Sequence, residues 1–265
     1  MLERNDKKLI ENNLHLTINQ LVNCFGGKYT RKEIKNFLSN NNLKCQKENS
    51  GTRKARIQVV QRSQTPINHD YFKTWSHNMA YILGIWYADG CIFSNNGNGY
   101  YFSIKLHKDD KYLLQLILNE MNSSHKIYEN NDNSVNITIS SKTIYYDLIS
   151  LGGKENKSLS ITLPNVPDEY MHDFLRGYFD GDGCVTYKKD RKYYSRYICS
   201  GSIKFVDNIY EYLKNNNIIE GSGVYNSKGC GIPRLVFNKK DGINFEKYIM
   251  KNNPCLYLKR KHDLE

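Results

Sequence analysis

Hydrophobic and polar residues alternate along two stretches in the first half of the chain. Residues 100–107 (YYFSIKLH) place Phe102, Ile104 and Leu106 on one face, and residues 135–140 (VNITIS) alternate in the same way. A period of two residues predicts two half-buried strands, each with one polar face. Those polar faces carry Ser103, Lys105 and His107 on the first strand and Asn136 and Thr138 on the second.

The second half of the chain repeats this order of elements. Helices are predicted where apolar residues recur every three or four positions, and strands where short runs alternate between turn residues. The predicted helices cover residues 110–121, 142–151, 203–214 and 242–250, and the predicted second-half strands cover 185–188, 193–199, 223–226 and 234–237. With one more helix at the start of each half, the pattern is a duplicated αββαββα unit of the α+β class.

Each half opens with a copy of the same stretch. The copies are residues 80–90 (AYILGIWYADG) and 173–183 (DFLRGYFDGDG), and their closing Asp-Gly pairs are 93 residues apart. Residues four apart share a helix face, and each copy has small residues at that spacing: Gly84 with Ala88, and Gly177 with Gly181. A helical glycine costs about 1 kcal/mol relative to alanine, so we expect these faces to form a close helix–helix contact. Neither copy is long enough to span a membrane.

An aspartate ends each of these predicted helices. Asp89 and Asp182 would face the negative poles of the helix dipoles, which is electrostatically unfavourable. Two such carboxylates close together, beside the carbonyls of Ala88 and Gly181, would suit a hard divalent cation. The alternative is that two Asp-Gly turns simply end two core helices. The duplication of the aspartate in register favours the metal site.

Residues 82–90 (ILGIWYADG) and 175–183 (LRGYFDGDG) resemble the paired signature helices of the LAGLIDADG homing endonucleases, in their single-chain, two-copy form. The first copy departs from the family in having Tyr87 where an acidic residue is common, a position not needed for catalysis. The resemblance covers about residues 70–265. It implies the duplicated homing-endonuclease fold, in which two pseudo-symmetric halves place antiparallel sheets side by side as a saddle on DNA.

The resemblance also implies an activity. A site-specific double-strand DNA endonuclease would leave short 3′ overhangs, with Asp89 and Asp182 as catalytic metal ligands and Lys157 and Lys261 as basic residues near the scissile phosphates. The expected ion is Mg²⁺, with Mn²⁺ able to substitute and Ca²⁺ binding without supporting cleavage. The expected partner is a long asymmetric DNA target bound by a monomer. Candidate contacts on the polar sheet faces are Ser103, Lys105, His107, Asn136, Thr138, Lys188, Arg196 and Arg234.

Charge is distributed unevenly along the chain. The net charge is +11, of which residues 1–68 carry +8, so we expect a separate N-terminal module. Residues 17–25 and 30–40 predict a helix-turn-helix, with Thr30 and Glu33 as a capping box. Its second helix presents Arg31, Lys32 and Lys35 outward, either to DNA or simply to solvent.

The predicted divisions of the chain follow from these features. They are a basic all-α module (1–45), a linker (46–68) and two repeats (69–165 and 166–265). The linker contains Arg53, Lys54 and Arg56, and it either follows the phosphate backbone or only connects the modules.

Two other functions use the same fold: a catalytically silent DNA-binding regulator and a maturase that binds intron RNA. The paired Asp89 and Asp182 favour the nuclease over both, because a protein that only binds nucleic acid has no physical reason to keep two carboxylates at helix ends. An intein endonuclease would need a splicing block, which we do not expect here. Seven cysteines without a Cys-x-x-Cys pair argue against a disulfide framework or a zinc site. The N-terminal residues resemble neither a signal nor a transit peptide, so we expect a protein that is cytoplasmic, or located wherever the host genome resides, and not secreted.

Overall fold

The computed structural model describes residues 2–14, 18–25, 28–45, 65–95, 98–226 and 231–264. The chain divides into two compact units between Gln64 and Thr65. The predicted linker contacts Arg53, Lys54 and Arg56 lie outside the described residues. Residues 65–68, assigned to the linker from sequence, belong to the larger unit, because Asn68 N donates to Met121 O at 2.9 Å.

The smaller unit contains three described helices around a single apolar cluster. They are α1 (Arg4–Asn12), α2 (Ile18–Cys24) and α3 (Arg31–Asn40). The capping box at the start of α3 is confirmed: Glu33 N donates to Thr30 Oγ1, and Thr30 N donates to the Glu33 carboxylate at 2.9 Å. The cluster contains Ile10, Leu21, Tyr29, Ile34, Phe37 and Leu38. Helix α1 was not predicted, and it supplies Ile10.

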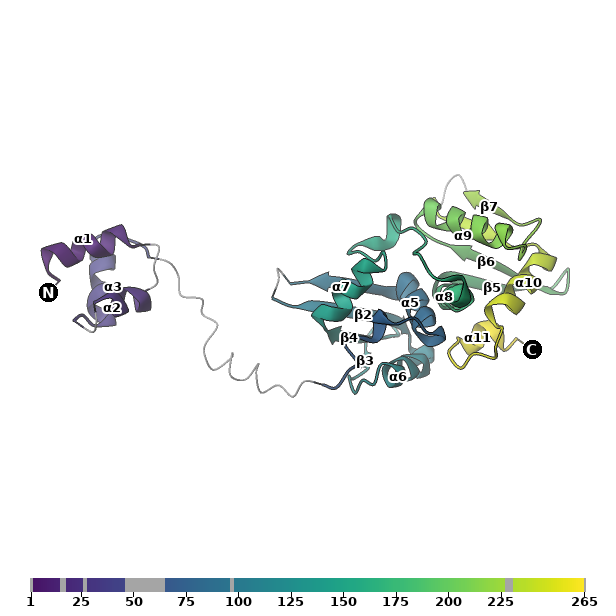
Figure 1. Ribbon diagram of the computed structural model, residues 1–265, viewed down its shortest axis with the longest axis horizontal. Helices are drawn as coiled ribbons and strands as arrows, with labels where there is room; N and C mark the ends of the chain where they lie inside the picture. The colour runs from purple at the N-terminus through teal and green to yellow at the C-terminus, as the bar shows by residue number, and fades with distance from the viewer. Residues whose placement is uncertain are drawn as a thin grey trace. The chain divides into compact units, whose positions relative to one another are not determined.

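In the larger unit, each repeat begins with a motif helix and continues into a four-stranded sheet (Figure 1). The first repeat comprises α5 (His77–Asp89), β1 (Gly90–Ser94), β2 (Tyr100–His107), α6 (Lys111–Glu120), β3 (Tyr128–Glu129), β4 (Ser134–Ser140) and α7 (Lys142–Ser150). The second comprises α8 (Asp168–Asp182), β5 (Gly183–Lys188), β6 (Tyr193–Cys199), α9 (Ile203–Asn215), β7 (Gly223–Asn226), β8 (Pro233–Val236), α10 (Lys239–Ile249) and α11 (Lys259–His262). Short 3₁₀ turns lie before α5 (η1, Tyr71–Lys73), between β2 and α6 (η2, Lys108–Asp110) and between α7 and α8 (η3, Lys157–Leu159).

The two sheets have the same antiparallel topology. Their strand orders are β1-β2-β4-β3 and β5-β6-β8-β7. The alternation seen in the sequence explains why one face of the first sheet is buried: Phe102 pairs with Ile139 and Ile104 pairs with Ile137, all fully covered. Helices α6 and α7 pack on that face, as α9 and α10 do in the second repeat. The opposite faces are left for contacts outside the unit.

Helices α5 and α8 lie side by side at the centre of this unit, between the two sheets (Figure 1). Both helices are buried along most of their length, with exposed first residues and half-buried last residues. No described helix is both long enough and apolar enough to cross a lipid bilayer.

Candidate active site

The contact between α5 and α8 requires residues without side chains. A Cβ at Gly84 would lie 2.1 Å from Phe174 O, and a Cβ at Gly177 would lie 2.1 Å from Tyr81 O. Each glycine therefore contacts the backbone of the opposite helix. One turn further on, a Cβ at Gly181 would meet the Cβ of Ala88 at 2.3 Å and Asp89 Oδ2 at 2.7 Å. The four small residues thus fix how closely the two helix ends approach.

This close contact brings the carboxylates at the helix ends into one region. Asp89 and Asp182 are both half-buried at the junctions of α5 with β1 and of α8 with β5. Burial and, to a smaller extent, the negative charge of Asp182 raise the pKa of Asp89 to about 6. Burial also raises the pKa of Asp182. The site therefore concentrates negative charge that is only partly compensated.

Lys157 and Lys261 hold equivalent places in the two repeats. Lys157 Nζ donates to Tyr87 O at 2.8 Å and to Ala88 O at 3.4 Å. Lys261 Nζ donates to Phe179 O at 2.9 Å, to Gly181 O at 3.1 Å and to two further carbonyls, those of Asp180 and Gly183. Each ammonium therefore neutralises the carbonyl end of its motif helix. Burial lowers the pKa of both lysines, while the two aspartates oppose that change.

The sequence around each lysine explains its position. Asn156 adopts a left-handed backbone conformation (φ 53°), which asparagine tolerates, and turns the chain so that Lys157 begins η3. In the second repeat, the C-terminal segment is fixed by Asp180. Its carboxylate accepts from Leu258 N at 2.8 Å and lies 2.7 Å from His262 Nε2. Sequence analysis missed this network, although Asp180 stands two residues before the motif aspartate.

Two hollows open beside the aspartates. One, of about 250 Å³, is lined by Asp182 together with Ala88 and Lys157 of the first repeat. The other, of about 340 Å³, is lined by Asp89 together with Gly181 and Arg260 of the second repeat. Each acid thus faces a hollow to which the opposite repeat contributes. Arg260, another residue that sequence analysis missed, is held by a bidentate contact with Asp110, at 3.1 and 2.9 Å.

Most of the predicted DNA contacts of this unit lie on the outer sheet faces. Lys105, His107 and Lys188 are exposed, and Asn136 and Thr138 are half-buried on the face opposite the core. Lys105 pairs with Asp132 at 2.7 Å. Arg234 is half-buried, and its guanidinium lies 5.2 Å from the centre of the Tyr197 ring. In the smaller unit, Arg31, Lys32 and Lys35 are exposed on α3.

Two of the predicted contacts are buried, and one of them, Arg196, lies on the wrong face of its sheet. Arg196 is buried on the helix-covered face, the same face as Ile198 two residues on, and it pairs with Glu246 of α10 at 3.0 Å. It therefore holds α10 to the sheet and does not face DNA. Ser103 has the predicted orientation but is buried, because its hydroxyl donates to Ile137 O at 2.7 Å and contacts Thr138.

The site residues are compatible with a hard divalent cation. Two half-buried carboxylates with raised pKa values, from chain segments fixed by backbone packing, supply the oxygen ligands such ions prefer. The predicted carbonyl ligands, Ala88 and Gly181, already accept a hydrogen bond from a lysine. They retain one lone pair each, so the carboxylates are the stronger candidates.

A protein-family model matches most of the second repeat. Residues 169–250 match the family model described as a LAGLIDADG-like domain. An uncharacterized protein of Methanocaldococcus jannaschii, MJ0398, is 30% identical over 143 residues, which are 50% of this chain and 49% of that protein. The match thus spans about half the length of that relative.

One solved structure extends the likeness in fold to both repeats. A mesophilic variant of the homing endonuclease I-DmoI aligns with 72% of this chain and 97% of its own, with 19% identity and a TM-score of 0.50. I-DmoI in complex with DNA and Ca aligns with 70% of this chain and 92% of its own, with 20% identity and a TM-score of 0.48. The duplicated LAGLIDADG homing-endonuclease fold expected from the motif copies is therefore confirmed.

Proposed function

We propose that this protein is a site-specific double-strand DNA endonuclease of the homing type, dependent on a divalent metal and leaving short 3′ overhangs. One observation carries the proposal. Two aspartates, one from each repeat, lie half-buried at neighbouring helix ends where their charges oppose each other. A protein that only binds nucleic acid gains nothing from this unfavourable arrangement, whereas a metal-dependent hydrolase needs it.

Asp89 and Asp182 would hold Mg²⁺ through their carboxylate oxygens. The bound ion would lower the pKa of an attacking water and stabilise the leaving oxygen. Lys157 and Lys261 supply positive charge fixed at the helix ends, where negative charge grows on the phosphate during cleavage. With one aspartate and one lysine per repeat, each repeat would serve one DNA strand.

The outer sheet faces would bind the duplex. β-ribbons fit the major groove, and the exposed Lys105, His107 and Lys188 offer hydrogen-bond donors there. We propose Arg31, Lys32 and Lys35 of α3 as a second contact with DNA, whose added affinity depends on tethering to the first. The expected active form is a monomer, because both halves of the site come from one chain.

The test is cleavage of a pooled DNA-target library in Mg²⁺ by the wild type, Asp89→Asn and Asp182→Asn. Asp207→Asn is the matched control, since Asp207 is also half-buried but lies on α9, behind the sheet. We expect discrete double-strand cuts by wild type and control, a loss of at least about a hundredfold in each motif variant, and DNA binding without cutting when Ca²⁺ replaces Mg²⁺.

Other outcomes would redirect the assignment. Specific DNA retention without cuts would identify a regulator, and retention of structured RNA would identify a maturase. Cleavage by Asp182→Asn at the wild-type rate would remove the paired acids from the mechanism.

A further inference from the structure

We propose that His77, His172 and Asp173 form a second metal site, specific for an imidazole-preferring divalent ion of the Zn²⁺ class, which joins the two repeats. His77 is the first residue of α5, in the first repeat, and the other two lie on α8, in the second. The site is at the opposite end of the helices from the paired aspartates, about 18 Å along α5 at 1.5 Å per residue.

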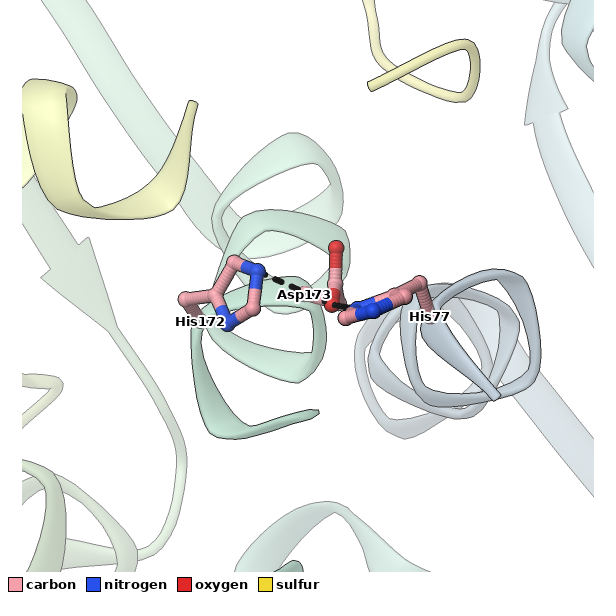
Figure 2. A group of neighbouring side chains, drawn as sticks. All are labelled: His77, His172 and Asp173. Atoms are coloured by element: carbon pink, nitrogen blue, oxygen red, sulfur yellow. Dashed lines mark hydrogen bonds and ion pairs between the residues drawn. The ribbon is translucent and has the colours of Figure 1, made fainter. Parts of the chain in front are cut away.

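The three side chains converge on one point (Figure 2). His77 Nδ1 lies 2.6 Å from Asp173 Oδ2, and His172 Nε2 lies 3.1 Å from the same oxygen. One potential ligand atom from each residue falls within 4.8 Å of the others. Ligand atoms around a tetrahedral zinc ion are about 3.3 Å apart, given bonds of about 2.0 Å. Small side-chain rotations would therefore admit an ion.

His172 is the observation that favours a ligand over a simple ion pair. Its side chain is 1% exposed, and neither ring nitrogen makes a hydrogen bond to any described residue. The 3.1 Å approach of Nε2 to Asp173 does not have hydrogen-bond geometry. A buried polar group without a hydrogen-bond partner is energetically unfavourable.

Asp173 is oriented for this role by Arg176. The guanidinium contacts Asp173 Oδ1 at 2.7 Å and donates to Ile249 O and Leu256 O at 2.8 and 3.0 Å. Oδ2 is therefore directed toward the histidines. Carboxylates that bind metals are commonly oriented in this way by a hydrogen bond to the other oxygen.

The donor set selects the class of ion. Two imidazoles and one carboxylate oxygen suit Zn²⁺, Co²⁺ or Ni²⁺, whereas Mg²⁺ and Ca²⁺ prefer oxygen ligands throughout. The positive charge of Arg176, 2.7 Å from Asp173, also disfavours a cation that would be bound only by electrostatic attraction to this carboxylate. His77 is 51% exposed, so an ion could enter from its side and retain a water as fourth ligand. The cysteine pattern gave no sign of this site because its donors are not thiols.

The test is Zn²⁺ titration by calorimetry of the metal-stripped full chain in excess Mg²⁺, which occupies oxygen-only sites. His77→Gln removes one ligand from an exposed position. His107→Gln is the matched control, since His107 is also 51% exposed and lies beside Asp109. We expect one Zn²⁺ per chain, with binding weakened at least about tenfold by His77→Gln and unchanged by the control.

A second measurement separates histidine ligands from the cysteines. Co²⁺ bound here should give visible absorption bands of four-coordinate geometry, without the intense near-ultraviolet band of a thiolate ligand. Zn²⁺ should also raise the melting temperature of the wild type but not that of His77→Gln. Equal Zn²⁺ affinity of wild type and His77→Gln, or a thiolate band in the Co²⁺ spectrum, would overturn the proposal. Neither readout depends on DNA cleavage.

Discussion

Two residues before the motif aspartate, the first repeat has Tyr87 and the second has Asp180. The Tyr87 hydroxyl donates to Leu151 O at 2.8 Å. Asp180 instead accepts from Tyr81 and Leu258 and pairs with His262, which also contacts Glu246 at 2.7 Å. Both arrangements anchor the segment leading to the lysine of that repeat. One uses a single neutral hydrogen bond and the other a buried charged network.

This difference shows that a pseudo-symmetric site need not be symmetric in stability. Lys157 has two carbonyl acceptors, and Lys261 has four. The second repeat thus holds its lysine with more hydrogen bonds. The segment that carries this lysine, however, is fixed by Asp180 and His262, and the charge of His262 depends on pH. The predictions below separate what the two repeats share from what they do not.

The largest effect is expected from removing each ammonium. Lys157→Met and Lys261→Met should each slow single-turnover cleavage in Mg²⁺ by at least about a hundredfold, since fixed charge near the phosphate is lost. Lys261→Met should also lower the melting temperature more, because it leaves more carbonyls without a donor. Equal melting temperatures for the two variants would contradict the comparison of the lysines.

The glycines should be equivalent in the two repeats. Gly84→Ala and Gly177→Ala should each lower the free energy of unfolding by about 3 kcal/mol, because the added Cβ meets an opposing carbonyl at 2.1 Å. Gly242→Ala in α10 is the control, since its Cβ would find ordinary contact at 3.6 Å from Phe237. Urea unfolding measures all three. A variant at Gly84 or Gly177 as stable as wild type would refute the backbone contact.

A pH-dependent difference should come from His262. Burial disfavours its charge, but Asp180 and Glu246 more than offset this and raise the pKa to about 9. A group with a raised folded-state pKa contributes stability that is full below its unfolded value, about 6.5, and is lost as pH rises through about 9. Wild type should therefore lose up to about 3 kcal/mol across this window relative to His262→Gln.

The matched variant for that prediction is Tyr87→Phe, in the first repeat. Burial raises the pKa of Tyr87, so it does not titrate in this window. Its unfolding curves should follow the wild-type pH dependence. A flat wild-type profile between pH 6.5 and 9, with both variants parallel to it, would exclude the charged network as a stabilising feature.

The smallest effect concerns the helix caps after each sheet. Ser141 caps α7 by accepting from Ile144 N, and Asn238 caps α10 by accepting from Asp241 N. Alanine at either position should cost about 1 kcal/mol. Asn238→Ala should cost more, because Asn238 Nδ2 also donates to the fully buried Asp241 at 2.8 Å, whereas the second contact of Ser141 is with the exposed His69. Thermal unfolding ranks the two, and the reverse order would be inconsistent with this contact.

Several elements could be predicted because one local rule decided them. The alternation of residues 100–107 fixed both ends of β2, and the capping box placed the start of α3. The spacing of Gly84 and Gly177 from the aspartates anticipated the contact of the motif helices. These features depend on residues that are close in sequence.

Other features depend on distant residues and were missed. In residues 193–199, aromatic and polar residues occur at both odd and even positions, so the sequence does not show which face of β6 is buried. Arg196 was therefore assigned to the outer face. Ser103 has the predicted parity, but its burial depends on the neighbouring strand β4. His77 and Asp173 are 96 residues apart, and only the packing of α5 on α8 brings them together.

The glycine contacts have a consequence for how such a chain arises. What Gly84 and Gly177 meet is main chain, so this part of the contact depends only on small residues, whereas pairs such as Tyr81 with Asp180 depend on the side chains of both helices. A duplicated half can therefore diverge in its sheet without compensating changes at Gly84 and Gly177. Divergence of the two sheets after a duplication is thus separated from the packing that joins the repeats at these glycines.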